Sequence, residues 1–211
     1  NWLHRKRNEN YFINPKLIIR QIGNTPIINI DLKGYYTLNT IYNVITLNSN
    51  YPLKVLFAII NSKVIKYYWS KKFSDSKTLF PKIKKSQLVK IPIKINIPIQ
   101  LNKMLETTID FLLFLKSNSF DDKYFKLFEQ LTDSLIMELY FNNQIKSAGC
   151  EILKHLTGPT PITEAMTDDE KMRIITQTYN ELSNPAHPVA QNLKRMDEIE
   201  EVRIIKGLDQ P

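Results

Sequence analysis

The sequence predicts an α+β protein in which a mixed β-sheet domain with an amphipathic helix is followed by an all-helical unit. Short runs rich in Ile, Val and Tyr, bounded by Gly, Asn and Pro, dominate the first fifty residues and are typical of strands. From residue 101 onward, apolar residues recur at helical spacing. The charge divides at the same place: residues 1–100 carry 17 Lys and Arg against 3 Asp and Glu, a net charge of +14, and residues 101–211 carry 12 against 18, a net charge of −6. We therefore expect two domains, over residues 1–100 and 101–211.

The strands of the first domain are indicated by β-branched residues and turn signals. We expect a strand over 16–23, two strands joined by a turn at Lys33 and Gly34 within 25–40, and a further strand over 41–49. Pro52 then opens an amphipathic helix over 52–69, because proline is tolerated in a first helical turn. A polar loop over 70–78 follows. Residues 88–99 look strand-like, but their two prolines confine them to an edge strand or an extended linker.

The second domain reads as a series of helices with recognisable ends. An aspartate caps the second helix, Gly158 closes the third, and Thr167 is the N-cap of the fourth, which stops before Pro185. The predicted helices cover residues 102–118, 121–141, 143–158, 167–184 and 187–205.

Composition excludes several classes of protein. An apolar content of 43% with 24% charged residues is enough for a packed core. The single cysteine excludes an internal disulfide framework and favours a reducing compartment, so we expect a cytoplasmic protein. No apolar run is long enough to span a membrane, and we expect no membrane partner. The chain begins with Asn1 instead of an initiator methionine, so we interpret it as a fragment of a longer protein.

We expect no catalytic residue and no metal site in this chain. Cys150 and His155 could form a dyad, but both lie in one short apolar segment, where a structural cysteine is the simpler interpretation. The acidic run at 168–170 opens a predicted helix, whose dipole explains it. Gly23 and Gly34 stand alone, so no glycine-rich phosphate loop is indicated.

A binding surface for a polyanion is better supported. Lysines and aromatic residues interleave over 63–85, and lysines that neutralise phosphates supply affinity for nucleic acid regardless of sequence. Arg20 and Gln21 have side chains suited to the edges of guanine and adenine, and the polar loop could reach phosphates or bases. The predicted DNA-binding residues are Arg20, Gln21, Lys33, Tyr35, Lys71, Lys72, Ser74, Ser76, Lys77, Thr78, Lys82, Lys84 and Lys85.

The order of the segments resembles a known family. KLIIRQIGN (16–24), YYTLNTIYNVI (35–45), YPLKVLFAIINSKVIKYYW (51–69) and LFPKIKKSQLVKIPI (79–93) are similar to the TaqI-like C-terminal specificity domain. That domain is the target recognition part of N6-adenine DNA methyltransferases and of fused type IIG restriction–modification enzymes. The exit of the last segment also resembles type I specificity subunits. FEQLTDSLIMELYF, ILKHL, YNELSNPAHPV and IEEVRII, in the second half, are similar to the helical end of the fused enzymes.

The resemblance implies a role in reading double-stranded DNA for a separate catalytic domain that methylates adenine, with or without cleavage. That upstream methyltransferase domain would belong to the same parent chain and use S-adenosylmethionine, and its Asn/Asp-Pro-Pro-Tyr/Phe motif does not occur here. We therefore expect no cofactor and no enzymatic activity in this fragment. The helical half could pack against the catalytic domain or form a homodimer. Two alternatives stay open: a general RNA-binding or nucleic-acid-binding module, and a helical scaffold for protein interaction.

Overall fold

The structure is a computed structural model that describes residues 8–46, 51–73, 81–118 and 120–208. The chain forms two compact units. The first contains Asn1–Asn61 and Ile65–Ile93, and the second contains Ser62–Val64 and Lys94–Pro211. Within the described residues, no helix is long and apolar enough to cross a membrane.

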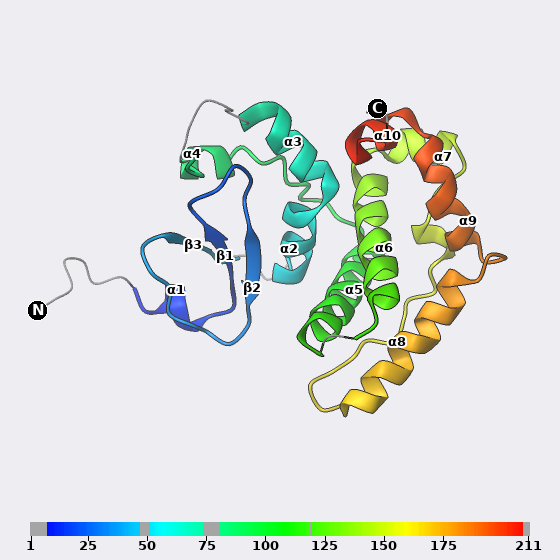
Figure 1. Cartoon of the computed structure of the whole chain (residues 1–211), viewed down its shortest axis with the longest axis horizontal. Coiled ribbons are helices and arrows are strands. Elements are labelled where there is room, and N and C mark those ends of the chain that lie inside the picture. Colours follow the sequence, from blue (N-terminus) through cyan, green and yellow to red (C-terminus); the bar gives the residue numbers. More distant parts are fainter. Residues whose placement is uncertain (1–7, 47–50, 74–80, 119, 209–211) are drawn as a thin grey trace, which may run out of the picture. The chain divides into compact units, whose positions relative to one another are not determined.

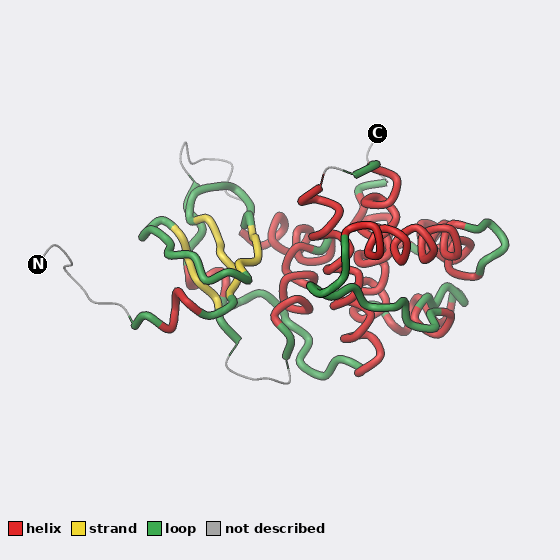
Figure 2. The backbone as a smooth tube through the Cα atoms, turned by 90° about the horizontal axis from the view of Figure 1, so that it is seen from below, coloured by secondary structure: helices red, strands yellow, loops and turns green. Residues whose placement is uncertain are grey.

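A three-stranded antiparallel sheet is the centre of the first unit, and the predicted α+β class is confirmed (Figure 2). Strand β1 (Lys16–Arg20) lies between β2 (Ile28–Asp31) and β3 (Ile41–Val44). Ile18 stands opposite Asn29 of β2 and Asn43 of β3. Because side chains directly opposite each other in an antiparallel pair share a face, this register fixes which residues of the three strands lie together.

The described residues of the first unit form four helices, of which α2 packs on one face of the sheet (Figure 1). The helices are α1 (Asn10–Ile13), α2 (Leu53–Asn61), α3 (Lys63–Phe73) and α4 (Lys85–Leu88). Helix α2 packs against β1 and β2. The core between them consists of fully buried apolar side chains, among them Leu17, Ile19, Val55 and Ile59. Burying such side chains is worth about 1.5–3 kcal/mol each, so this face of the sheet sets the register of β1.

The hairpin predicted within residues 25–40 is wrong. Strand β2 ends at Asp31, pairs with β1 instead, and no strand follows before Ile41. The Asp31 carboxylate accepts hydrogen bonds from the backbone N–H groups of residues 33–35, which bends the chain away from a two-residue turn.

Two other expectations for the first unit need correction. The helix predicted over 52–69 is divided at Ser62 into α2 and α3, where the Asn61 side chain donates to the Phe57 carbonyl and competes with the helical backbone. Helix α3 also continues to Phe73, so residues 70–73 of the predicted loop over 70–78 are helical, and residues 74–78 lie outside the described residues. Residues 88–99 contain no strand: residues 89–98 form the linker between α4 and α5, so the linker is the expected alternative that is confirmed, in agreement with prolines that lack an N–H donor.

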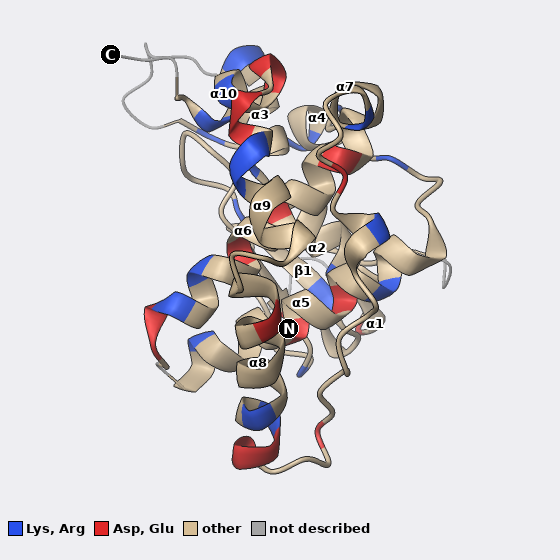
Figure 3. Cartoon of the chain, turned by 90° about the vertical axis from the view of Figure 1, so that its right-hand side faces the viewer, with Lys and Arg blue, Asp and Glu red and all other residues tan. Residues whose placement is uncertain are grey.

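The second unit is helical, as predicted. The structure assigns it α5 (Ile99–Asn118), α6 (Asp122–Tyr140), α7 (Asn142–Ser147), α8 (Asp168–Ser183), α9 (Pro188–Arg195) and α10 (Glu200–Lys206), with the short 3₁₀ turns η1 (Leu153–His155) and η2 (Met196–Glu198). Helices α5 and α6 pack against each other, and the rings of Phe111 and Phe128 meet edge to face at 5.1 Å between centroids. Thr167 and Glu170 form a capping box at the start of α8, where Figure 3 shows the acidic first turn.

The predicted helices over 143–158 and 187–205 are shorter than expected. Helix α7 ends at Ser147, because Gly149 has a φ of +63° and turns the chain out of the helix. The last segment forms α9, η2 and α10 in place of one helix, and Ile199 between η2 and α10 is extended.

Candidate nucleic-acid interface

Basic side chains gather where β1 ends. The segment 81–83 runs antiparallel to residues 21–23: Ile83 N donates to Gln21 O at 2.8 Å, Gly23 N donates to Pro81 O at 3.0 Å, and Ile22 bridges Lys82. This pairing brings the end of β1 beside a lysine-rich segment more than sixty residues further along the chain. We call the exposed residues Arg20, Lys82, Lys84 and Lys85 the basic cluster.

The backbone of the basic cluster is well fixed. Ile83 between its lysines is 3% exposed, and its carbonyl accepts a hydrogen bond from the Tyr42 hydroxyl at 3.2 Å. Lys84 N donates to the side-chain oxygen of Gln87 at 2.8 Å, which holds the start of α4. The lysine side chains themselves extend from this ordered backbone into solvent, as phosphate contacts require.

Gln21 is placed differently from its neighbour Arg20. Its side-chain amide donates to Asn39 O at 2.9 Å, and its backbone N–H donates to Thr40 O at 3.1 Å. Gln21 therefore fastens the end of β1 to the segment that leads into β3. Its role in reading a base stays a prediction.

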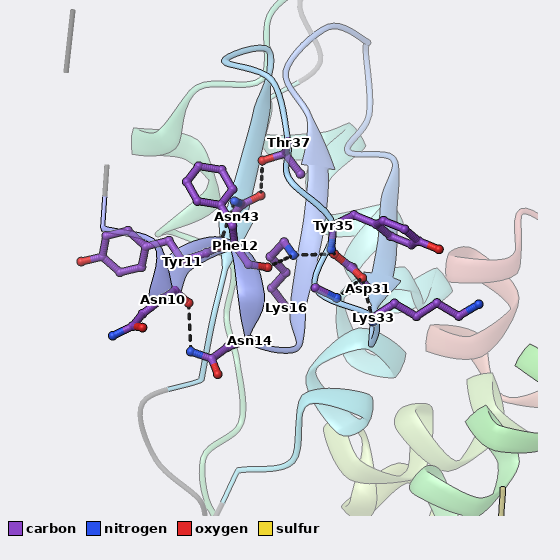
Figure 4. A network of polar contacts seen from close by, with 11 residues as sticks. Asn10, Tyr11, Phe12, Asn14, Lys16, Asp31, Lys33, Tyr35, Thr37 and Asn43 are labelled. Atoms are coloured by element: carbon purple, nitrogen blue, oxygen red, sulfur yellow. Dashed lines mark hydrogen bonds and ion pairs between the residues drawn. The ribbon is translucent and has the colours of Figure 1, made fainter. Parts of the chain in front are cut away.

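A buried ion pair lies at the other end of the same strands. The Lys16 ammonium group, which is fully buried, pairs with the Asp31 carboxylate and also donates to Phe12 O (Figure 4). Burial acts to raise the pKa of Asp31, but its bond to Lys16 and three backbone N–H groups outweigh it, so the pKa lies below its ordinary value. Asp31 is therefore a charged acceptor at neutral pH.

This ion pair positions Lys33 and Tyr35. Asp31 accepts hydrogen bonds from Lys33 N at 2.9 Å, Gly34 N at 3.0 Å and Tyr35 N at 2.8 Å. Both predicted side chains are exposed and point away from the network in Figure 4. Gly34 has a φ of +79°, and a Cβ there would lie 2.5 Å from Ile13 O, so only glycine fits. The turn at 31–35 consequently holds the backbone of Lys33 and Tyr35 in a fixed position.

Lys71 and Lys72 lie at the end of α3. Their ammonium groups lie over the rings of Tyr67 and Tyr68 at 5.5 Å and 6.0 Å from the centroids. The neighbouring Trp69 is 1% exposed and donates from its indole to Asn24 O at 2.9 Å. Trp69 is thus a core residue, whereas Lys71 and Lys72 are exposed to solvent or a ligand.

The predicted residues therefore occupy three places in the first unit: the end of β1 with residues 81–85, the turn after β2, and the end of α3. Ser74, Ser76, Lys77 and Thr78 lie outside the described residues. Sequence reasoning missed Asn29, an exposed residue in the middle of β2. The signal was available, because Asn29 is the polar residue between two isoleucines in a run that alternates between faces.

The second unit contains fewer candidate functional groups than the first. Cys150 is a free, buried cysteine, and burial raises the pKa of its thiol, which disfavours the reactive thiolate. Glu170 is held by the Thr167 capping box, in agreement with a structural role for the acidic run. Among the described residues, no group of three His, Cys, Asp or Glu could hold a metal ion.

Comparison with known families identifies the first unit. Residues 1–93 match the family model of the TaqI-like C-terminal specificity domain, so the chain carries such a domain over these residues. This domain implies recognition of a DNA target in restriction–modification enzymes. No curated protein and no solved structure matches the chain.

Proposed function

We propose that this chain recognises a specific DNA sequence for a restriction–modification enzyme and holds the duplex for N6 methylation of an adenine by a catalytic domain of the same parent protein. The single observation that supports this most strongly is the basic cluster on a TaqI-like specificity domain. Lys82, Lys84 and Lys85 would hold the DNA backbone, and this places the side chains of the sheet against the bases.

The methyl transfer itself is assigned to the catalytic domain. S-adenosylmethionine would supply the methyl group there, and we assign none of the residues of this chain to it. The two glycines of residues 1–93, Gly23 and Gly34, lie in separate turns and form no glycine-rich cofactor loop. Target recognition needs access to genomic DNA, so we place the protein in the cytoplasm, and we propose the helical second unit as its contact with the catalytic domain or a second copy.

The first test is binding of the 211-residue chain to random-sequence duplex DNA across a range of salt concentrations. Counterion release predicts that the logarithm of affinity falls linearly with the logarithm of salt, by about 0.9 for each phosphate contacted. No binding to DNA even at low salt, together with salt-independent capture of a protein partner, would instead indicate a protein-interaction scaffold. Equal competition by duplex RNA would indicate a general nucleic-acid module.

Charge reversal then locates the interface. Changing Lys82, Lys84 and Lys85 together to Glu should abolish binding at moderate salt, with unchanged far-UV circular dichroism because all three are exposed. The matched control changes three exposed lysines of the second unit, Lys103, Lys146 and Lys194, to Glu, which alters the net charge equally. If both triple variants weaken binding to the same extent, net charge decides the affinity and the proposed interface is wrong.

A further inference from the structure

One face of the central sheet carries a second set of polar side chains. Side chains alternate along a strand, so Lys16, Ile18 and Arg20 share the face of β1 opposite to Leu17 and Ile19. Ile18 stands directly opposite Asn29, which places Asn29 on this same face, diagonally next to Arg20. We call this the outer face, because α2 packs on the side of the buried Leu17 and Ile19.

One end of the outer face is covered and the other is open. At the covered end, Lys16 and Asp31 are buried beneath α1 and the turn at 31–35. The side-chain oxygen of Asn43 accepts a hydrogen bond from the Thr37 hydroxyl, and its side-chain nitrogen donates one to Tyr11 O. At the open end, Arg20 and Asn29 are exposed, and the neighbouring Ile27 is 58% exposed.

The functional groups at the open end are available. Asn29 uses its side-chain oxygen once, to accept from Ile30 N at 2.8 Å, and that oxygen has a second lone pair. Within the part of the chain that the structure describes, neither the Asn29 amide nitrogen nor the Arg20 guanidinium group has a hydrogen-bond or ion-pair partner. Lys82 bridges Ile22, which lies two residues beyond Arg20, so its charge extends this surface.

We infer that Arg20 and Asn29 form a two-residue base-reading pair on the outer face of the sheet, and this rests on the proposed function. Arginine makes paired hydrogen bonds to guanine, and asparagine makes paired hydrogen bonds to adenine, in the major groove. Diagonal residues of neighbouring strands are about 7–8 Å apart, close to two base steps of about 3.4 Å each. Duplex DNA is the occupant that fits, because the adjoining Lys82, Lys84 and Lys85 complement its charge.

Adjacency in the sequence suggests a different base-reading pair, Arg20 and Gln21. Gln21 follows Arg20 directly, but successive residues of a strand point to opposite faces, and the Gln21 amide is bonded to Asn39 O. Asn29 comes from another strand and reaches the same face as Arg20 through the register. The adenine-reading role therefore goes to Asn29.

The test is selection of bound sequences from a random duplex library with the full chain and two variants. Asn29→Thr keeps a neutral side chain that suits a strand, and Arg20→Lys keeps the charge but loses the planar fork. Each variant should lose preference at its own base pair and bind the wild-type motif about 5- to 150-fold more weakly. Affinity for random DNA should stay within about twofold, since neither change alters the net charge.

Controls separate this inference from the proposed function. Asn180→Thr, at an exposed position in α8, should leave the selected motif unchanged. Circular dichroism and urea unfolding of both variants establish that the sheet is intact. If the wild-type chain binds no DNA, the proposed function fails and the base-reading pair with it. If the wild-type chain selects a motif that folded Asn29→Thr and Arg20→Lys select equally well, the base-reading pair alone is wrong.

Discussion

Lys16 and Asp31 stand directly opposite each other on β1 and β2, and their side chains form an ion pair that is buried from solvent. The pair joins three features of the first unit: it ties α1 through the Phe12 carbonyl, it ends β2, and it fixes the turn that presents Lys33 and Tyr35. This ion pair fixes both buried contacts and the exposed turn that carries Lys33 and Tyr35. Its removal should therefore lower both the stability of the protein and its binding to DNA.

Removing one member of this pair should destabilise the protein strongly. Lys16→Met leaves the Asp31 carboxylate buried without its partner, and we expect the free energy of unfolding to fall by about 3–5 kcal/mol. The double variant Lys16→Met with Asp31→Asn keeps an oxygen acceptor for the turn and leaves no buried charge, so it should recover part of the loss. Urea unfolding of the three proteins measures this; a double variant no more stable than Lys16→Met would contradict the account.

The same pair predicts a dependence on acid. The pKa of Asp31 is lower in the folded protein than its ordinary value of about 3.9, so its stabilising contribution is complete above that value. The contribution is lost as pH falls from about 4 through the folded pKa. Unfolding free energies measured against pH should therefore fall more steeply for wild type than for the uncharged double variant in this window, and parallel curves would show that Asp31 does not supply the difference.

Gly34 should be irreplaceable, in contrast to another glycine with nearly the same backbone angle. Gly34 and Gly158 have φ values of +79° and +83°, but a Cβ at Gly34 would meet Ile13 O at 2.5 Å, whereas nothing lies within 4 Å at Gly158. Gly158→Ala should cost about 1–2 kcal/mol for the left-handed conformation alone. Gly34→Ala should cost clearly more, because the backbone must also move. Thermal unfolding of both variants gives the comparison, and equal losses would refute the steric argument.

Glu138 should respond to substitution in a pH-dependent way. It is 8% exposed and accepts from Ile152 N at 2.8 Å and Leu153 N at 3.1 Å. Burial raises its pKa more than these two bonds lower it, so the unfolded state releases its proton first and the wild type loses stability as pH rises from about 4.3 through the folded pKa. Glu138→Gln keeps an acceptor without the charge.

Unfolding measured at several pH values tests this assignment. Glu138→Gln should equal or exceed the stability of wild type at pH 7, with any advantage gone below about pH 4. Glu138→Ala is the contrast, because it leaves two backbone donors unsatisfied and should cost about 2–4 kcal/mol below about pH 4, with a smaller loss relative to wild type at pH 7. A Gln variant as unstable as the Ala variant at pH 7 would show that the charge of Glu138 is required.

Local patterns in the sequence predicted the α+β class, the central strand, and the helices α5, α6 and α8 to within a few residues. Their signals are local: periodic apolar residues and capping side chains. The failures have distant causes. No residue near Asp31 in the sequence indicates that Lys16 will pair with it. The turn signal at Lys33 and Gly34, taken without that ion pair, therefore predicts a hairpin. The early end of α7 is the exception, because Gly149 was visible in the sequence.

For the candidate nucleic-acid interface, the charge of the sequence predicted the lysines, but no sequence pattern predicted which distant segments pair with each other. The lysines at 82, 84 and 85 were predicted as DNA-binding residues from charge alone, and all three are exposed; their contact with DNA stays a prediction. Their proximity to Arg20 depends on hydrogen bonds between residues 21–23 and 81–83, which no local pattern encodes. The exposure of Asn29 could be predicted from the alternation along its strand, but its position next to Arg20 could not, because it follows from the register of β1 and β2.

Gln21 provides the sharpest contrast between sequence adjacency and spatial adjacency. Gln21→Ala removes one exposed hydrogen bond to Asn39 O and should cost about 0.5–1.5 kcal/mol of stability. If bases are read from the outer face of the sheet, Gln21→Ala should select the same DNA motif as wild type, whereas Asn29→Thr should lose one position of it. Selection from the same duplex library, with both variants at equal occupancy, makes the comparison. Loss of a motif position in Gln21→Ala, with none in Asn29→Thr, would move the reading surface from the outer face to the end of β1, where residues 81–83 pair with 21–23.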